Sequence, residues 1–197
     1  MPATAFPLGE RGKETDFIIG GHKGRKRMKQ DFVKREKENE TRIRRLESAD
    51  RPQIERIVVS SGKFNEDEIK TALELVDEAL EKGENSGYIV IVLECEKKMQ
   101  GYACYGPTPL TQGVYDLYWI VVNRAVQKKG FGRRLLAYVE RDIIERGGRM
   151  LLIETSSQET YDPTVRFYKR SGYELVARIR NFYRMGDDKL VFSKELI

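Results

Sequence analysis

YDLYWIVVNRAVQKKGFGRRLLAYVERDIIERG, residues 115–147, is the stretch that decides the fold. Its first part, Tyr115 to Val122, is rich in β-branched and aromatic side chains, which suit a buried strand. Its last part repeats apolar residues at helical spacing from Leu135 until Gly147 ends the pattern. The sequence therefore predicts a central strand, a glycine-containing loop and a helix in direct succession.

The loop between this strand and this helix has the chemistry of an anion site. Gly130 and Gly132 stand where the helix begins, so unpaired backbone N–H groups and the positive end of the helix dipole meet there. Glycine has no Cβ, which lets a ligand approach the backbone closely. Four basic residues add positive charge around the same point: Lys128, Lys129, Arg133 and Arg134. These features predict a binding site for a phosphate or pyrophosphate.

Spacing excludes two familiar phosphate-binding motifs. A Rossmann fingerprint needs a third glycine where this chain has Leu135, and a P-loop needs Gly-Lys-Ser/Thr, which neither Gly130 nor Gly132 begins. The pattern Ile120-Val121-Val122 … Gln127-x-x-Gly130-x-Gly132 instead resembles motif A of the GNAT family of acyl-CoA-dependent N-acyltransferases. This resemblance implies that the loop amides bind the pyrophosphate of coenzyme A and that the preceding strand binds its pantetheine arm.

A second stretch, Tyr161 to Tyr173, strengthens the resemblance. Asp162 suits a helix N-cap, Pro163 the first helical position and Gly172 the stop. Phe167-Tyr168-x-x-x-Gly172-Tyr173 resembles the second half of the GNAT signature, in which the tyrosine lies beside the thioester sulfur. The family relation implies acetyl-CoA as cofactor, bound by Ile120, Val121, Val122, Gln127, Lys128, Lys129, Gly130, Phe131, Gly132, Arg133 and Phe167.

The remaining segments complete a mixed α/β order. Strands are expected at 41–46, 88–93, 99–105, 149–155, 173–180 and 189–194, and helices at 52–58 and 65–83. The resemblance covers roughly residues 42–197. It implies the GNAT fold, with a mixed seven-stranded sheet that splays between its fourth and fifth strands and about four helices.

The N-terminal residues differ in composition from this domain. Residues 1–45 hold 13 Lys and Arg against 7 Asp and Glu, a balance of +6, whereas the whole chain carries +5. Residues 23–29 form a dense basic cluster with little apolar sequence around it. We expect residues 1–41 to be a flexible extension and residues 42–197 to be the acetyltransferase domain.

Other compositional signals exclude several function classes. Cys95 and Cys104 are expected to be reduced, partly buried thiols on neighbouring strands, and no metal-ligand spacing is present. The single histidine, His22, lies in the basic extension, which makes a Ser-His-Asp or Cys-His mechanism improbable. No apolar run is long enough to span a membrane, and no secretory signal begins the chain, so a cytoplasmic protein is expected.

Catalytic roles follow from the chemistry of amine acetylation. Tyr168 is the expected acid for the departing thiolate, and a backbone amide near Val122 is the expected oxyanion donor. Asp116 is the candidate base. Strand alternation places its side chain on the face of Tyr118 and Ile120, and some GNAT members carry a catalytic glutamate there. Asp116 could instead hold a cationic acceptor or pair with an arginine, and a water chain could replace it as base.

The sequence thus predicts an acetyl-CoA-dependent N-acetyltransferase that acts on a primary amine by direct attack on the thioester. One alternative is a GNAT module that binds acyl-CoA without turnover. Another is a protein that binds nucleic acid or a protein partner through residues 23–29. A homodimer remains open, and Tyr183, Arg184 and Asp187 either border the acceptor or are surface residues of a hairpin, the favoured interpretation. Tyr161 stands where several GNAT members carry an asparagine that contacts the pantetheine.

Overall fold

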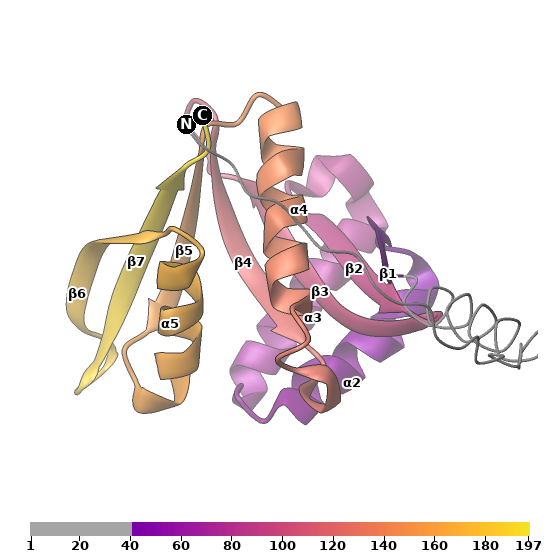
Figure 1. The fold of residues 1–197 in the computed structure, drawn as a ribbon, viewed down its shortest axis with the longest axis horizontal. Helices are drawn as coiled ribbons and strands as arrows, with labels where there is room; N and C mark the ends of the chain where they lie inside the picture. Colours follow the sequence, from indigo (N-terminus) through magenta and orange to yellow (C-terminus); the bar gives the residue numbers. More distant parts are fainter. Residues whose placement is uncertain (1–40) are drawn as a thin grey trace, which may run out of the picture. The chain divides into compact units, whose positions relative to one another are not determined.

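The computed structural model describes residues 41–197 (Figure 1). A seven-stranded sheet runs in the order β1-β2-β3-β4-β5-β7-β6. Its strands are β1 (Thr41–Arg45), β2 (Ile89–Cys95), β3 (Lys98–Pro107), β4 (Val114–Val122), β5 (Met150–Ser156), β6 (Glu174–Arg184) and β7 (Asp187–Glu195). The α-helices are α2 (Arg51–Ser61), α3 (Glu66–Lys82), α4 (Phe131–Glu145) and α5 (Asp162–Arg170), joined by short 3-10 turns η1 to η4. The predicted fold class is confirmed. The expected extension, its basic cluster at 23–29 and His22 lie outside the described residues.

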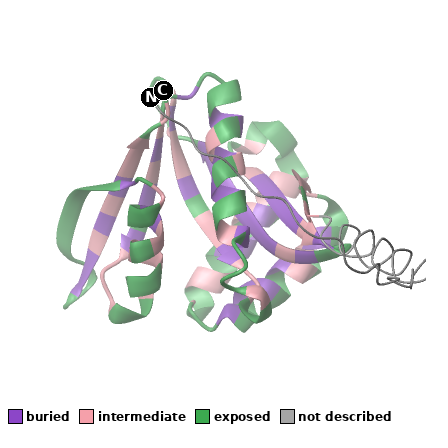
Figure 2. Ribbon diagram, viewed as in Figure 1, coloured by how far each residue is buried: buried purple, intermediate pink, exposed green. Residues whose placement is uncertain are grey.

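The helices cover both faces of the sheet (Figure 1). α4 and α5 contribute Leu135, Val139 and Tyr168 to one buried cluster, together with residues of β2 to β5 and β7. α2 and α3 contribute Ile54 and Val76 to a second cluster on the other face. In α4 the buried residues recur at helical spacing and so lie on one side of the helix, as the apolar periodicity predicted (Figure 2).

The sheet opens between β4 and β5. These two strands are parallel and pair only from Val114 with Met150 to Leu117 with Ile153. Beyond Leu117, β4 continues for five residues, of which Trp119 to Val122 pair with β3 alone, while β5 continues with β7. Figure 1 shows the two strands diverging from this point. The expected splay between the fourth and fifth strands is therefore confirmed.

A bulge in β4 interrupts the regular alternation of side chains that the sequence predicted. Cys104 pairs with Trp119 and Tyr105 with Leu117, so Tyr118 is an extra residue in the ladder. Leu117 and Ile120, three positions apart, both pack in the α4 cluster. Asp116 precedes Leu117 and therefore faces the α2–α3 side, opposite Ile120. The prediction that Asp116 and Ile120 share a face was wrong, because regular alternation does not survive a bulge.

One of the two helix N-caps predicted from the sequence is present in the structure. The Asn65 side chain caps α3 by accepting a hydrogen bond from the Glu68 amide at 2.9 Å, and the Glu68 carboxylate accepts one from the Asn65 amide at 2.8 Å. Asp162 is not the N-cap of α5. It already has helical backbone angles, and Tyr161 occupies the cap position instead.

The C-terminal hairpin is longer than expected. β6 continues past Arg180 to Arg184, and β7 begins at Asp187 rather than 189. Asn181 has a left-handed φ of 52°. Two hydrogen bonds stabilise this conformation: the Asn181 amide donates to the Asp188 carboxylate, and the Gly186 amide donates to the Asn181 side-chain oxygen. This local bend lets the strand continue through Phe182 and Tyr183.

Both cysteines are free, as predicted, and they are buried rather than partly buried. Within residues 41–197, no helix is long and apolar enough to cross a membrane. The same residues contain no group of three or more His, Cys, Asp or Glu side chains placed to hold a metal ion.

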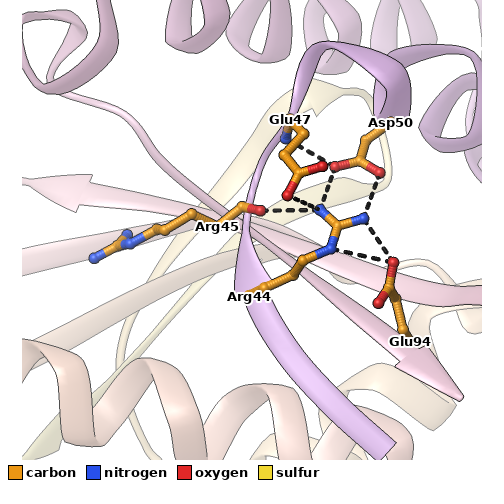
Figure 3. A network of polar contacts seen from close by, with 5 residues as sticks. All are labelled: Arg44, Arg45, Glu47, Asp50 and Glu94. Atoms are coloured by element: carbon orange, nitrogen blue, oxygen red, sulfur yellow. Dashed lines mark hydrogen bonds and ion pairs between the residues drawn. The ribbon is translucent and has the colours of Figure 1, made fainter. Parts of the chain in front are cut away.

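A buried charge network fixes the start of α2 (Figure 3). Arg44 of β1 donates hydrogen bonds to both oxygens of Asp50 at 2.6 and 2.9 Å and to Glu94 of β2 at 2.6 and 3.1 Å. Burial opposes the ionisation of Asp50. The hydrogen bonds from Arg44 and from the Glu47 amide outweigh it and hold the pKa of Asp50 below its usual value. The network joins β1, β2 and the turn that begins the α2–α3 layer.

Replacing Arg44 by alanine leaves the Asp50 carboxylate buried without its cation. Removing one partner of a buried pair costs about 3–5 kcal/mol, so we expect urea denaturation at pH 7 to show a loss of about 3 kcal/mol in the free energy of unfolding. Because the folded-state pKa of Asp50 is lowered, this stabilisation is present above about pH 4 and disappears as the pH falls through the folded-state pKa.

The matched control is Arg42→Ala, which removes an exposed arginine of the same strand that forms no ion pair with a described residue. Its free energy of unfolding should change by less than about 0.5 kcal/mol. An equal loss in the two variants would show that the network contributes nothing beyond strand β1 itself.

Candidate active site

The glycine loop presents free backbone donors at the start of α4. Gly130 is the N-cap with a φ of 82°, a conformation that favours glycine, and the first helical bond runs from the Arg134 amide to the Gly130 carbonyl at 3.1 Å. The amides of Phe131, Gly132 and Arg133 make no backbone hydrogen bond with a described residue. These donors, together with the positive end of the α4 dipole, favour an anion at the start of the helix.

The basic residues of the loop are available to a ligand. Lys128, Lys129, Arg133 and Arg134 are exposed, and none of the four forms an ion pair with a described residue. Lys128 has a left-handed φ of 67°, which is uncommon for a residue other than glycine. Gln127 is exposed on the same loop. The loop therefore combines uncompensated positive charge with open amides.

Gly132 lies where the two arms of the splay approach each other. A Cβ at this position would lie 3.7 Å from the ring of Phe167 in α5 and 3.8 Å from the side chain of Val122 in β4. Both distances are ordinary van der Waals contacts, and the φ of Gly132 is not left-handed. Packing within the protein does not require glycine here. The absence of a side chain instead leaves the backbone amide open to a ligand.

Tyr168 is enclosed by apolar rings but its hydroxyl has no partner. Its side chain is 4% exposed and packs beside Phe167, Tyr173 and Phe192. Burial raises the pKa of Tyr168, so the phenol stays protonated at neutral pH. Tyr102 has the one side-chain polar atom of the described residues that is both fully enclosed and unpaired. The Tyr168 hydroxyl, which makes no hydrogen bond, therefore reaches solvent.

The edge of β4 beyond Leu117 supplies main-chain groups and aromatic walls. Ile120, Val121 and Val122 pair with β3, and on the β5 side they have no strand partner in the described part of the chain. Tyr118 packs edge-on to Tyr88 at 5.3 Å. On the same face, Trp119 packs edge-on to Phe64 of the α2–α3 loop at 4.9 Å. The open strand edge is thus flanked by a protein wall on the α2–α3 face.

Asp116 lies next to that wall and apart from Tyr168. Its carboxylate accepts a hydrogen bond from the Thr108 hydroxyl at 2.7 Å. Burial is the main cause of the rise in the Tyr118 pKa to about 12, and the charge of Asp116 adds to it, so these two side chains are neighbours. The Tyr168 phenol packs in the α4 cluster, whereas Asp116 faces α2–α3. The two predicted catalytic groups therefore approach the splay from opposite faces of the sheet.

A cavity of about 200 Å³ extends from the glycine loop between α4 and α5. Arg133, Glu140, Arg170 and Lys194 line it. Lys194 pairs with Glu140 at 2.9 Å, whereas Arg133 and Arg170 form no ion pair with a described residue. The cavity therefore has two arginines that no described carboxylate neutralises.

Sequence reasoning missed one contact at the splayed end. The Tyr161 hydroxyl lies 3.4 Å from a Glu68 oxygen and 3.5 Å from the Lys63 carbonyl, which joins α5 to the α2–α3 wall. Tyr161 and Glu68 are 93 residues apart, so periodicity and local motifs could not reveal it. Of the predicted cofactor residues, Val122 and Phe167 lie beside Gly132, and their role in binding a cofactor stays a prediction.

The site combines a bulged central strand, a glycine loop with open amides and a tyrosine beyond the splay. The model of the GNAT acetyltransferase family matches residues 42–173, more than half of the chain. The chain belongs to the GNAT family. Among curated proteins, none matches this sequence.

Solved structures agree with this family assignment. A candidate GNAT acetyltransferase from Desulfovibrio desulfuricans is 45% identical, with a TM-score of 0.78 over 80% of this chain and 99% of that one. Two more distant structures share the GNAT fold. An aminoglycoside 6'-N-acetyltransferase bound to coenzyme A is 17% identical, with a TM-score of 0.63 over 79% of this chain and 97% of that one. A candidate acetyltransferase from Salmonella typhimurium, solved with acetyl-CoA, is 19% identical, with a TM-score of 0.62 over 81% and 95%.

Gly132→Ala tests whether the GNAT loop of this chain binds coenzyme A through its backbone. Alanine fits the φ and the space of position 132 and favours helix by up to about 1 kcal/mol, so the melting temperature should stay the same or rise. The added methyl group stands between Val122 and Phe167, where a ligand would approach the amides. We expect calorimetry to show at least about tenfold weaker binding of coenzyme A, and unchanged affinity would contradict a backbone-bound pyrophosphate.

Proposed function

We propose that this GNAT protein transfers the acetyl group of acetyl-CoA to a primary amine by direct attack of the amine on the thioester. The single observation that carries the proposal is the meeting of Val122, Gly132 and Phe167 at one point beside the glycine loop. That point joins the open edge of β4, the free amides of α4 and the helix of Tyr168. An acyl thioester held there has a phosphate anchor at one end and a protonated phenol at the other.

The residues present fit coenzyme A. The amides of Phe131, Gly132 and Arg133, with the loop lysines, suit its pyrophosphate, because backbone donors and cations at a helix start stabilise negative charge. The unpaired edge of Ile120 to Val122 suits the amides of its pantetheine arm. When bound, acetyl-CoA supplies the activated acetyl group.

Each chemical requirement of the transfer has a candidate group. A backbone amide near Val122 donates to the carbonyl oxygen as negative charge develops on it. Tyr168 donates its phenolic proton to the sulfur as the carbon–sulfur bond breaks, and burial keeps that proton in place until then. Asp116, on the α2–α3 face, accepts a proton from the bound ammonium directly or through water, and the neutral amine then attacks the thioester carbonyl. The amine therefore enters from the face opposite Tyr168.

A thiol-release assay tests the proposal with Tyr168→Phe as the first variant. Wild-type protein should release free thiol from acetyl-CoA when the right amine is present in a panel of small amines, amino acids, aminoglycosides, polyamines and peptides. Tyr168→Phe removes the acid and keeps the ring, so kcat should fall by about ten- to a thousandfold with coenzyme A affinity nearly unchanged. Unchanged kcat would remove Tyr168 from the mechanism. Coenzyme A binding with no thiol release from any amine would identify a binding module instead.

Asp116→Asn tests the proposed base through the pH–rate profile. Asparagine keeps the size of the side chain and the bond from Thr108 but cannot accept the proton of the attacking amine. We expect kcat/KM to fall and the acidic limb of its pH dependence to change shape. A profile that keeps its acidic limb would assign the proton to another acceptor such as water.

A further inference from the structure

The contact between Tyr161 and the α2–α3 wall has the geometry of a recognition site. Tyr161 precedes α5, Glu68 belongs to the first turn of α3, and Lys63 belongs to the α2–α3 loop. Three oxygen atoms converge here: the Tyr161 hydroxyl, one carboxylate oxygen of Glu68 at 3.4 Å from it, and the Lys63 carbonyl at 3.5 Å from it. They come from both arms of the splay.

These hydrogen bonds leave acceptor capacity unused. Bonds between hydroxyl and oxygen atoms in proteins usually span about 2.5–3.0 Å, so both contacts of Tyr161 are long. A single hydroxyl proton is also shared between two acceptors. A stronger donor with several protons, such as an ammonium group, could bind the carboxylate and the carbonyl together.

Glu68 lacks the cation that its carboxylate neighbours have. Glu154 pairs with Lys189 at 2.5 Å, and Asp187 lies 3.7 Å from Arg184. Glu68 forms no ion pair with a described residue, and its second oxygen accepts only the Asn65 amide. Burial first, and then Glu68, raises the pKa of Tyr161 to about 12, and burial followed by Glu154, Asp187 and Glu68 raises the pKa of Tyr183. Glu68 is therefore the carboxylate of this group that no described cation neutralises.

The helix that follows Tyr161 carries another polar group without a hydrogen-bond partner among the described residues. Tyr168 follows Tyr161 by seven residues, two helical turns, and is 4% exposed with a hydroxyl that no described residue bonds. Since this hydroxyl reaches solvent, water or a bound ligand can serve as its partner. Tyr161, the N-cap of α5, therefore links the Glu68 contact to the helix that carries Tyr168.

We propose that Glu68, Tyr161 and the Lys63 carbonyl bind an ammonium group of the acceptor, so that preferred acceptors carry a second positive charge besides the amine that is acetylated. This inference rests on the proposed acetyltransfer for its catalytic meaning. Diamines, polyamines and peptides with a lysine near the reacting amine share this chemistry.

Cadaverine and n-pentylamine test the proposal, because they have the same chain length and differ by one amine. Wild-type kcat/KM should favour cadaverine by about tenfold or more. Glu68→Gln should lower kcat/KM for cadaverine about tenfold more than for n-pentylamine, through KM rather than kcat, because it removes charge and keeps the side-chain shape. Tyr161→Phe, which leaves the carboxylate in place, should reduce the preference by a smaller factor.

The control is Glu66→Gln, which removes an exposed carboxylate from the same turn of α3 and should leave the preference unchanged. Equal kcat/KM for the two amines, or equal losses in Glu68→Gln and Glu66→Gln, would overturn the proposal. Melting temperatures of the variants show whether the α3 cap is intact.

Calorimetry separates this proposal from the proposed function. Cadaverine should bind the protein loaded with coenzyme A more tightly than n-pentylamine does, and Glu68→Gln should abolish the difference. If the protein releases no thiol but shows this Glu68-dependent binding, the recognition site stands and the acetyltransfer fails. If thiol is released but the two amines bind equally, the acetyltransfer stands and the recognition site is wrong.

Discussion

The end of hydrogen bonding between β4 and β5 is the constraint on which the rest of the structure depends. A parallel ladder joins the strands only up to Leu117 and Ile153, and the bulge at Tyr118 follows immediately. Beyond it, backbone groups of β4 are left without a strand partner, and such groups are costly unless a ligand or water satisfies them. An extended ligand rich in amides satisfies them best, so the splay itself favours a pantetheine-like arm.

The positions of both functional helices follow from that opening. α4 begins directly after β4 and directs its free amides at the splay, while α5 follows β5 and brings Phe167 to within van der Waals reach of Gly132. Positive charge at the loop remains uncompensated because no acidic side chain pairs with its lysines and arginines in the described residues. The folded loop is therefore positively charged and would attract an anionic ligand. Part of the binding free energy could then offset the entropy lost when the ligand is held in one orientation.

Charge of opposite sign marks the two sides of the splay. The glycine loop is basic, whereas Glu68 and Asp116 are carboxylates that form no ion pair with a described residue. A phosphate-bearing donor and a cationic acceptor would each be attracted to its own side. In the proposed reaction, such a division would orient the two substrates before any chemistry takes place, because each would be repelled from the position of the other.

The sequence by itself determined the features that depend on neighbours in the chain. The apolar period of α4, the glycine loop, the Asn65 capping box and the strand order of a GNAT domain could all be predicted, because each rests on local geometry or on a motif. The tertiary structure alone decided which face Asp116 occupies, where α5 begins and that Tyr161 meets Glu68. A bulge reverses alternation without a clear sequence signal, and contacts across 93 residues depend on how separate elements pack.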